Sequence, residues 1–152
     1  MSTATSGEVP FRFLLRVRDG EVDAQKIVFN ARWGDYIDIA VTEYQRRLFG
    51  AVEGPGSLDM RLVKQTTEWK GPAHFDDVIE ARVHTVKVGT TSFTIATELR
   101  RAPDGPVLAT SETVYVAIES ERGTKIPVPQ RFREALERGA AGVTVDSSGV
   151  TR

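Results

Sequence analysis

Asp23 lies seven residues ahead of the expected start of an amphipathic helix, and this pairing is the feature of the chain best able to do chemistry. Ile27, Val28 and Phe29 separate the carboxylate from Asn30, a good residue for a helix N-cap. The first backbone N–H groups of a helix lack internal partners and carry roughly half a positive charge, so they stabilise an oxygen that gains negative charge. A carboxylate just upstream supplies a base or nucleophile. Together these groups suit attack on an activated carbonyl.

The elements that must position these residues follow from hydrophobic periodicity. From Trp33 onward, apolar residues recur at three- and four-residue spacing until Gly50, which predicts a helix between Asn30 and Gly50. Period-two alternation predicts a strand over 11–17. Further strands are expected at 58–69, 78–88, 92–101 and 107–120, and a short helix at 129–138. This order predicts an α+β domain with an antiparallel sheet wrapped around the longer helix.

Length and composition limit the alternatives. The 152 residues fit one domain, with a flexible segment at 1–10, the domain at 11–138 and a disordered tail at 139–152 that is rich in Gly, Ser and Thr. A net charge of -1 gives no support to a nucleic-acid partner. The chain has no cysteine, no secretory signal and no apolar run of membrane-spanning length, so we expect a cytoplasmic protein without a membrane partner.

The segment from Val17 to Trp33, with Asp23-Ala-Gln and Asn30-Ala-Arg, resembles the signature of the 4-hydroxybenzoyl-CoA thioesterase-like hotdog proteins. The resemblance covers about 11–136 and continues through 42–46, 72–77, 89–93 and 109–116. It implies a hotdog fold, an antiparallel sheet wrapped around one long central helix. It also implies an acyl-CoA thioesterase that hydrolyses an acyl or aroyl thioester, and a homodimer or homotetramer with active sites between subunits.

By this resemblance Asp23 attacks the thioester or activates a water, and the Asn30 N–H donates to the thioester oxygen. The Asn30 side chain could equally serve only as a helix cap. The substrate-binding positions implied are Gln25, Ile27, Val28, Phe29, Trp33, Thr90 and Thr91. Gln25 could instead form hydrogen bonds only within its loop, and Trp33 could instead pack in the hydrophobic core. The pair Thr90-Thr91 is interpreted as a strand connection near the coenzyme.

Two positions depart from the family pattern. Glu21 stands where an aspartate is usual, and it could pair with Asp23 as acid and base or simply face solvent. Lys26 stands where glycine is usual. If the loop requires a positive φ there, lysine costs of order 1 kcal/mol or forces another loop shape.

Coenzyme A enters as part of the substrate, and no other cofactor is expected. Its phosphates would meet basic residues, for which the candidates are Lys87, Arg100, Arg101, Lys125 and Arg131. His74 and His84 are too far apart in sequence to suggest a local ligand pair, so no metal site is expected.

Three alternatives remain open from the sequence. An acyl-carrier-protein thioesterase would use the same residues on another thioester carrier. A hotdog dehydratase fits less well, because neither histidine lies in the region where such enzymes pair a histidine with an acid. A non-catalytic acyl-thioester binding protein is favoured by Lys26. The sequence does not predict the acyl group.

Overall fold

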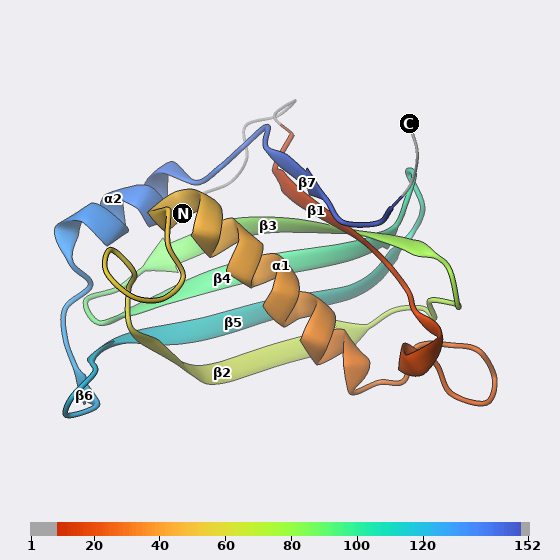
Figure 1. The fold of residues 1–152 in the computed structure, drawn as a ribbon, viewed down its shortest axis with the longest axis horizontal. Coiled ribbons are helices and arrows are strands. Elements are labelled where there is room, and N and C mark those ends of the chain that lie inside the picture. The colour runs from red at the N-terminus through yellow and green to blue at the C-terminus, as the bar shows by residue number, and fades with distance from the viewer. Residues whose placement is uncertain (1–8, 150–152) are drawn as a thin grey trace.

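The computed structural model describes residues 9–149, in which a mostly antiparallel sheet carries two helices (Figure 1). In chain order the elements are β1 (Phe11–Arg16), the short 3-10 helix η1 (Asp19–Glu21), α1 (Arg32–Phe49), β2 (Met60–Trp69), β3 (Val78–Val88), β4 (Ser92–Arg101), β5 (Val107–Glu119), β6 (Thr124–Lys125), α2 (Gln130–Arg138) and β7 (Thr144–Asp146). The expected α+β class is confirmed. Helix α1 has 18 residues and α2 has nine.

The strands form a seven-stranded sheet in the order β2-β5-β4-β3-β1-β7, with β6 paired to β5 outside this path. All neighbours are antiparallel except β1 and β7, which run parallel. Strand β2 forms one edge of the sheet, so one side of its backbone has no strand beside it within the described chain. Such an edge is a template for pairing with another chain.

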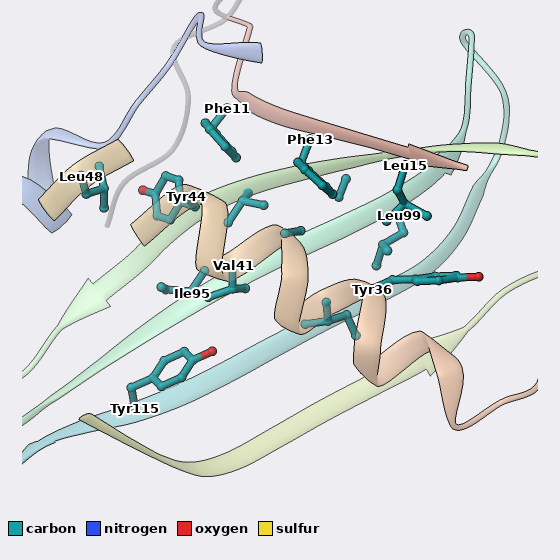
Figure 2. Close-up of a cluster of buried hydrophobic side chains, with 14 of the residues drawn as sticks. Phe11, Phe13, Leu15, Tyr36, Val41, Tyr44, Leu48, Ile95, Leu99 and Tyr115 are labelled. Carbon is teal, nitrogen blue, oxygen red and sulfur yellow. The ribbon is translucent and has the colours of Figure 1, made fainter. Parts of the chain in front are cut away.

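Helix α1 crosses one face of the sheet and buries a continuous apolar stripe against it (Figures 1 and 2). Ile37, Ala40, Val41 and Tyr44 are at most 1% exposed, as their three- and four-residue spacing requires. Alternate residues of β1 point to this core, as the buried–half-buried alternation of that strand shows. The helix ends at Gly50, whose φ of 79° is the left-handed conformation that favours glycine.

A tight turn at 102–106 connects β4 to β5. The N–H of Gly105 donates to the carbonyl of Arg101 at 2.8 Å. A Cβ on Gly105 would lie 2.3 Å from that same oxygen, so only glycine fits this turn.

The prediction of a disordered tail is wrong over 139–149, because β7 pairs with β1. The N–H of Arg12 donates to Val143 and that of Ser147 donates to Leu14, at 3.0 and 2.8 Å, and Val143 and Val145 pack on the core. A three-residue strand is too short to show periodicity, and its stability comes from an edge supplied by a distant strand. Residues 1–8, most of the segment predicted to be flexible, lie outside the described part. Within 9–149, no helix combines the length and apolar character needed to span a membrane.

Candidate active site

Asp23 lies in an exposed loop between η1 and α1, where its carboxylate is oriented by backbone groups of its own loop. Its Oδ1 accepts the N–H of Gln25 at 2.8 Å and that of Ile27 at 3.5 Å. The N–H of Asp23 donates back to the carbonyl of Ile27 at 2.9 Å. Within residues 9–149, Oδ2 accepts no hydrogen bond. The carboxylate is therefore held by one oxygen and offers the other to solvent or substrate.

Lys26 adopts a φ of 66°. The loop therefore has a left-handed backbone at the position where the family pattern has glycine, although lysine stands there in this chain. Its ammonium lies 3.4 Å from Asp19 in an exposed ion pair, which contributes little in water. Lysine at this angle carries Cβ strain that glycine would avoid.

Glu21 is buried and fully partnered, contrary to both interpretations from the sequence. Its carboxylate accepts hydrogen bonds from the Arg18 backbone and guanidinium at 2.8 and 2.9 Å, and from the Tyr36 hydroxyl at 2.9 Å. Burial acts to raise the pKa of Glu21, but the hydrogen bonds from Arg18 and Tyr36 outweigh it and the pKa is lowered. Burial and the Glu21 hydrogen bond raise the pKa of Tyr36. Glu21 thus has a structural role, since neither oxygen is free to act as a second acid or base.

The same residue ties the Asp23 loop to the helix start. The carbonyl of Glu21 accepts the N–H of Phe29 at 3.1 Å, while its side chain reaches Tyr36 in the second turn of α1. A buried charge with several hydrogen bonds is rigid, because breaking any one leaves an uncompensated group in the protein interior. The two ends of the loop are therefore fixed relative to α1.

The helix start differs from the sequence prediction in one respect. The N-cap is Ala31, and no side chain caps the helix, so Asn30 is not the cap. Asn30 is instead the first residue of a turn that leads into α1, and its carbonyl accepts the N–H of Trp33 at 3.3 Å. Over the described chain, the N–H groups of Asn30 and Ala31 find no acceptor. Two free donors therefore remain at the positive end of α1.

The two residues that bear these donors line a pocket of about 500 Å³ between the first turn of α1 and the second half of β2. Its lining residues are Asn30, Ala31, Gly34, Gln65, Thr66, Thr67 and Trp69. Its volume is in the range of small-molecule sites. Gln65 and Thr67 donate inward to Thr113 and Ser111 at 3.3 and 3.4 Å. The strand side is polar, except for the half-exposed ring of Trp69.

The sequence prediction missed the β2 residues and Gly34 of this pocket. An edge strand carries no local signal of which face will meet a helix. That depends on the pairing of Trp69 with Ala109 and Thr67 with Ser111 on β5, which places these β2 residues on the α1 side of the sheet.

The substrate-binding residues predicted near Asp23 lie in different environments. Gln25 and Phe29 are exposed, with Phe29 at 57%. Ile27 is half-buried, and its backbone forms an isolated antiparallel β-bridge with His74. Val28 and Trp33 are buried in the core at 5% and 2% exposure, so the structure gives them packing roles where substrate contact was expected. The Trp33 ring packs edge-on against Tyr36 at 5.6 Å between ring centres.

Thr90 and Thr91 are not brought to the same pocket. The carbonyl of Thr91 accepts the N–H of Ala117, at the opposite end of β5 from Ala109, which pairs with Trp69. The stretch from Ala109 to Ala117 spans about 26 Å at roughly 3.3 Å per residue. Within one chain, Thr91 and the start of α1 are therefore too far apart to contact the same acyl group.

The candidate phosphate-binding residues are mostly engaged elsewhere. Arg100 pairs with Glu98 at 2.5 Å and Arg101 with Asp77 at 3.1 Å. Arg131 donates to the carbonyl of Gly56 at 2.6 Å. Lys87 and Lys125 are exposed and form no ion pair with any described residue. They are the two candidates left free for a phosphate.

The histidines show no metal-site arrangement. Burial lowers the pKa of His84, while Glu112 and Glu98 act to raise it. In the described residues, no group of three or more histidine or carboxylate side chains is arranged to hold a metal ion.

Comparison with known proteins assigns this mixed α+β sheet, with a pocket at the start of its longer helix, to a family. Residues 17–136 match the thioesterase-like superfamily, and the chain belongs to this family. It is a thioester hydrolase of the hotdog type.

Individual relatives are distant in sequence. A 1,4-dihydroxy-2-naphthoyl-CoA hydrolase from Synechococcus elongatus is 21% identical over 131 residues, which cover 84% of this chain and 95% of the relative. The crystal structure of a 1,4-dihydroxy-2-naphthoyl-CoA thioesterase from Synechocystis has a TM-score of 0.73 at 19% identity, covering 83% and 94% of the two chains. A thioesterase from Thermus thermophilus, crystallised with coenzyme A and Zn, has a TM-score of 0.73 at 23% identity, covering 82% and 95%.

Proposed function

We propose that this protein hydrolyses an acyl-CoA thioester to a carboxylate and free coenzyme A, with Asp23 as base or nucleophile and the Asn30 N–H as oxyanion donor. One observation carries the proposal: the N–H groups of Asn30 and Ala31 are both without an acceptor in the described structure, and both residues line the pocket. Relatives that act on or bind CoA compounds support coenzyme A as the carrier.

Asp23 could act by two routes, as a base or as a nucleophile, and in each the atoms and charges balance with water as the only other reactant. As a base, Asp23 takes a proton from water, and the hydroxide attacks the carbonyl carbon. As a nucleophile, its free Oδ2 attacks that carbon and forms a mixed anhydride, which water then hydrolyses. In both routes the carbonyl oxygen becomes an oxyanion that accepts the Asn30 N–H. The C–S bond then breaks, and the thiolate leaves with little need for acid help. One oxyanion donor is typically worth about 3 kcal/mol in the transition state.

We further propose a dimer that shares its active sites. Two-fold pairing of β2 edges in antiparallel fashion would set the Met60 end of one copy beside the Trp69 end of the other. Because Thr91 lies at the Met60 end of the sheet, Thr91 of the partner subunit would then approach the pocket. This arrangement reconciles the implied role of Thr90 and Thr91 with their distance from α1 in one chain. A tetramer would assemble from two such dimers.

Gln25 and Phe29 are the exposed residues of the Asp23 loop, and we assign them to contacts with the water and acyl group. Lys87 and Lys125 are assigned to the coenzyme phosphates. A chain without cysteine suits the reducing cytoplasm, which is the proposed location.

The decisive test is a hydrolysis screen in which release of free thiol is measured on short, long, branched and aromatic acyl-CoA substrates. Each active acyl group is then presented on acyl-carrier protein. Turnover on the CoA esters, abolished by Asp23→Asn, supports the proposal. Preference for the carrier protein would identify the alternative substrate. Tight acyl-CoA binding with no turnover would identify a binding protein and overturn the enzymatic assignment.

A further inference from the structure

Gly34 is a glycine in the first turns of α1 that no packing contact requires. A Cβ built on it would meet no atom within 4 Å beyond its chain neighbours and the adjoining helix backbone. Its φ is not in the left-handed region. Glycine inside a helix is less stable than alanine, because its backbone loses more freedom on folding. The fold alone would therefore favour alanine here.

The pocket supplies the reason for glycine. Gly34 lines it together with Asn30 and Ala31, one helical turn away on the same side of α1. Side chains of a helix lean toward its N-terminus, so a residue covers the surface over the preceding turn. A side chain at 34 would lie over the turn that bears the two free N–H groups. The bare surface at Gly34 leaves those donors open to a ligand.

The opposite wall limits the same space. Thr67 and Trp69 line the pocket from β2, whose backbone is held by its pairing with β5. A carbonyl held by the Asn30 N–H would place its first acyl carbons between Gly34 and this strand. The space left between α1 and this strand therefore depends on the size of the residue at position 34.

We propose that Gly34 determines acyl specificity, by admitting acyl groups that carry a branch or a ring on the carbon next to the thioester carbonyl. The assignment rests on the proposed function, since it takes the free N–H groups as the carbonyl site. Beyond the proposed function, it names Gly34 as the residue that sets specificity and branched or ring-bearing acyl groups as the substrates that it admits. Straight acyl chains need less width there and depend less on Gly34.

The test uses Gly34→Ala and Gly34→Leu in the full-length protein, with Asp35→Leu as the control on a neighbouring residue that does not line the pocket. We measure kcat/KM for benzoyl-CoA, isobutyryl-CoA and acetyl-CoA, the melting temperature, and the molecular mass by light scattering. The expected result is that Gly34→Ala melts higher than the wild type. We also expect Gly34→Leu to lower the ratio of benzoyl-CoA or isobutyryl-CoA to acetyl-CoA turnover about 10-fold or more. Asp35→Leu should keep the wild-type ratio.

An equal loss on all substrates, an unchanged ratio in Gly34→Leu, or a Gly34→Leu protein that changes only its assembly would overturn the assignment. If the wild type hydrolyses none of the esters, the proposed function fails by itself. Binding of the matching non-hydrolysable thioethers then tests Gly34 separately. Gly34→Leu should weaken binding of the benzyl and isobutyl thioethers more than that of the ethyl thioether, and equal weakening would refute the role.

Discussion

The hydroxyl of Tyr36, a core residue labelled in Figure 2, donates to the buried carboxylate of Glu21 at 2.9 Å and so joins the second turn of α1 to the segment that precedes Asp23. Glu21 also binds the backbone of Arg18 and Phe29. The position of the Asp23 loop relative to the helix start therefore depends on a carboxylate that takes no part in the proposed chemistry.

Replacing Glu21 with Gln should lower the free energy of unfolding by about 1.5–3 kcal/mol at pH 7, because the variant loses the charged acceptor of three hydrogen bonds. Since the folded pKa of Glu21 is lowered, its contribution is complete above the unfolded pKa, near 4.3. The contribution is lost as pH falls through the folded pKa. Denaturant unfolding from pH 7 to pH 3 should show the two proteins converging in acid. Glu53→Gln, at an exposed position, is the control, and a constant difference across this range would contradict the assignment.

Asp23→Asn should keep the fold and lower kcat by about 100-fold or more. The amide oxygen can still accept the N–H of Gln25, so the loop geometry survives while the anionic charge is lost. Asp23→Ala should be at least as severe. Steady-state kinetics beside a melting curve provide the measurement. Wild-type turnover in a folded Asp23→Asn protein would remove Asp23 from the mechanism.

Lys26→Gly should stabilise the protein by about 1 kcal/mol, since glycine adopts a φ of 66° without Cβ strain. Lys26→Ala separates this effect from loss of the exposed pair with Asp19, because alanine keeps the strain. Chemical denaturation measures both variants. Equal stability of the glycine and alanine variants would show that the left-handed backbone is not strained.

Truncation after Gly142 should lower the melting temperature by several degrees, because it uncovers the β1 edge and removes Val143 and Val145 from the core. Truncation after Gly149 retains all the described pairing of β7 and is the matched control. If both truncated proteins melt like the full chain, β7 contributes nothing to stability.

The wild-type protein should be a dimer or tetramer by light scattering at low micromolar concentration. Leu62 and Val63 expose 47% and 53% of their surface on the edge strand β2, where a charge should oppose pairing. Val63→Asp is expected to shift the protein toward monomer and to reduce turnover together. Phe75→Asp, at an equally exposed loop residue, is the control. A fully active wild-type monomer would refute the shared active site.

The elements whose signals are local could be predicted from the sequence. The helix stripe from Trp33 to Leu48 and the strands at 78–88 and 92–101 follow from side-chain periodicity, and the structure confirms them. The resemblance in the segment from Asp23 to Asn30 located the candidate chemistry, because a loop and the helix that follows it are adjacent in the chain.

Features that depend on contacts between distant segments became visible only in the folded chain. The register of β2 on β5 placed Thr67 and Trp69 opposite Gly34, and so made the pocket. The fold buried Glu21 beneath α1, moved Thr91 to the far end of the sheet, and gave the tail a strand partner in β1. Burial, register and edge pairing are set by which surfaces meet in three dimensions, and neither periodicity nor spacing along one chain encodes that choice.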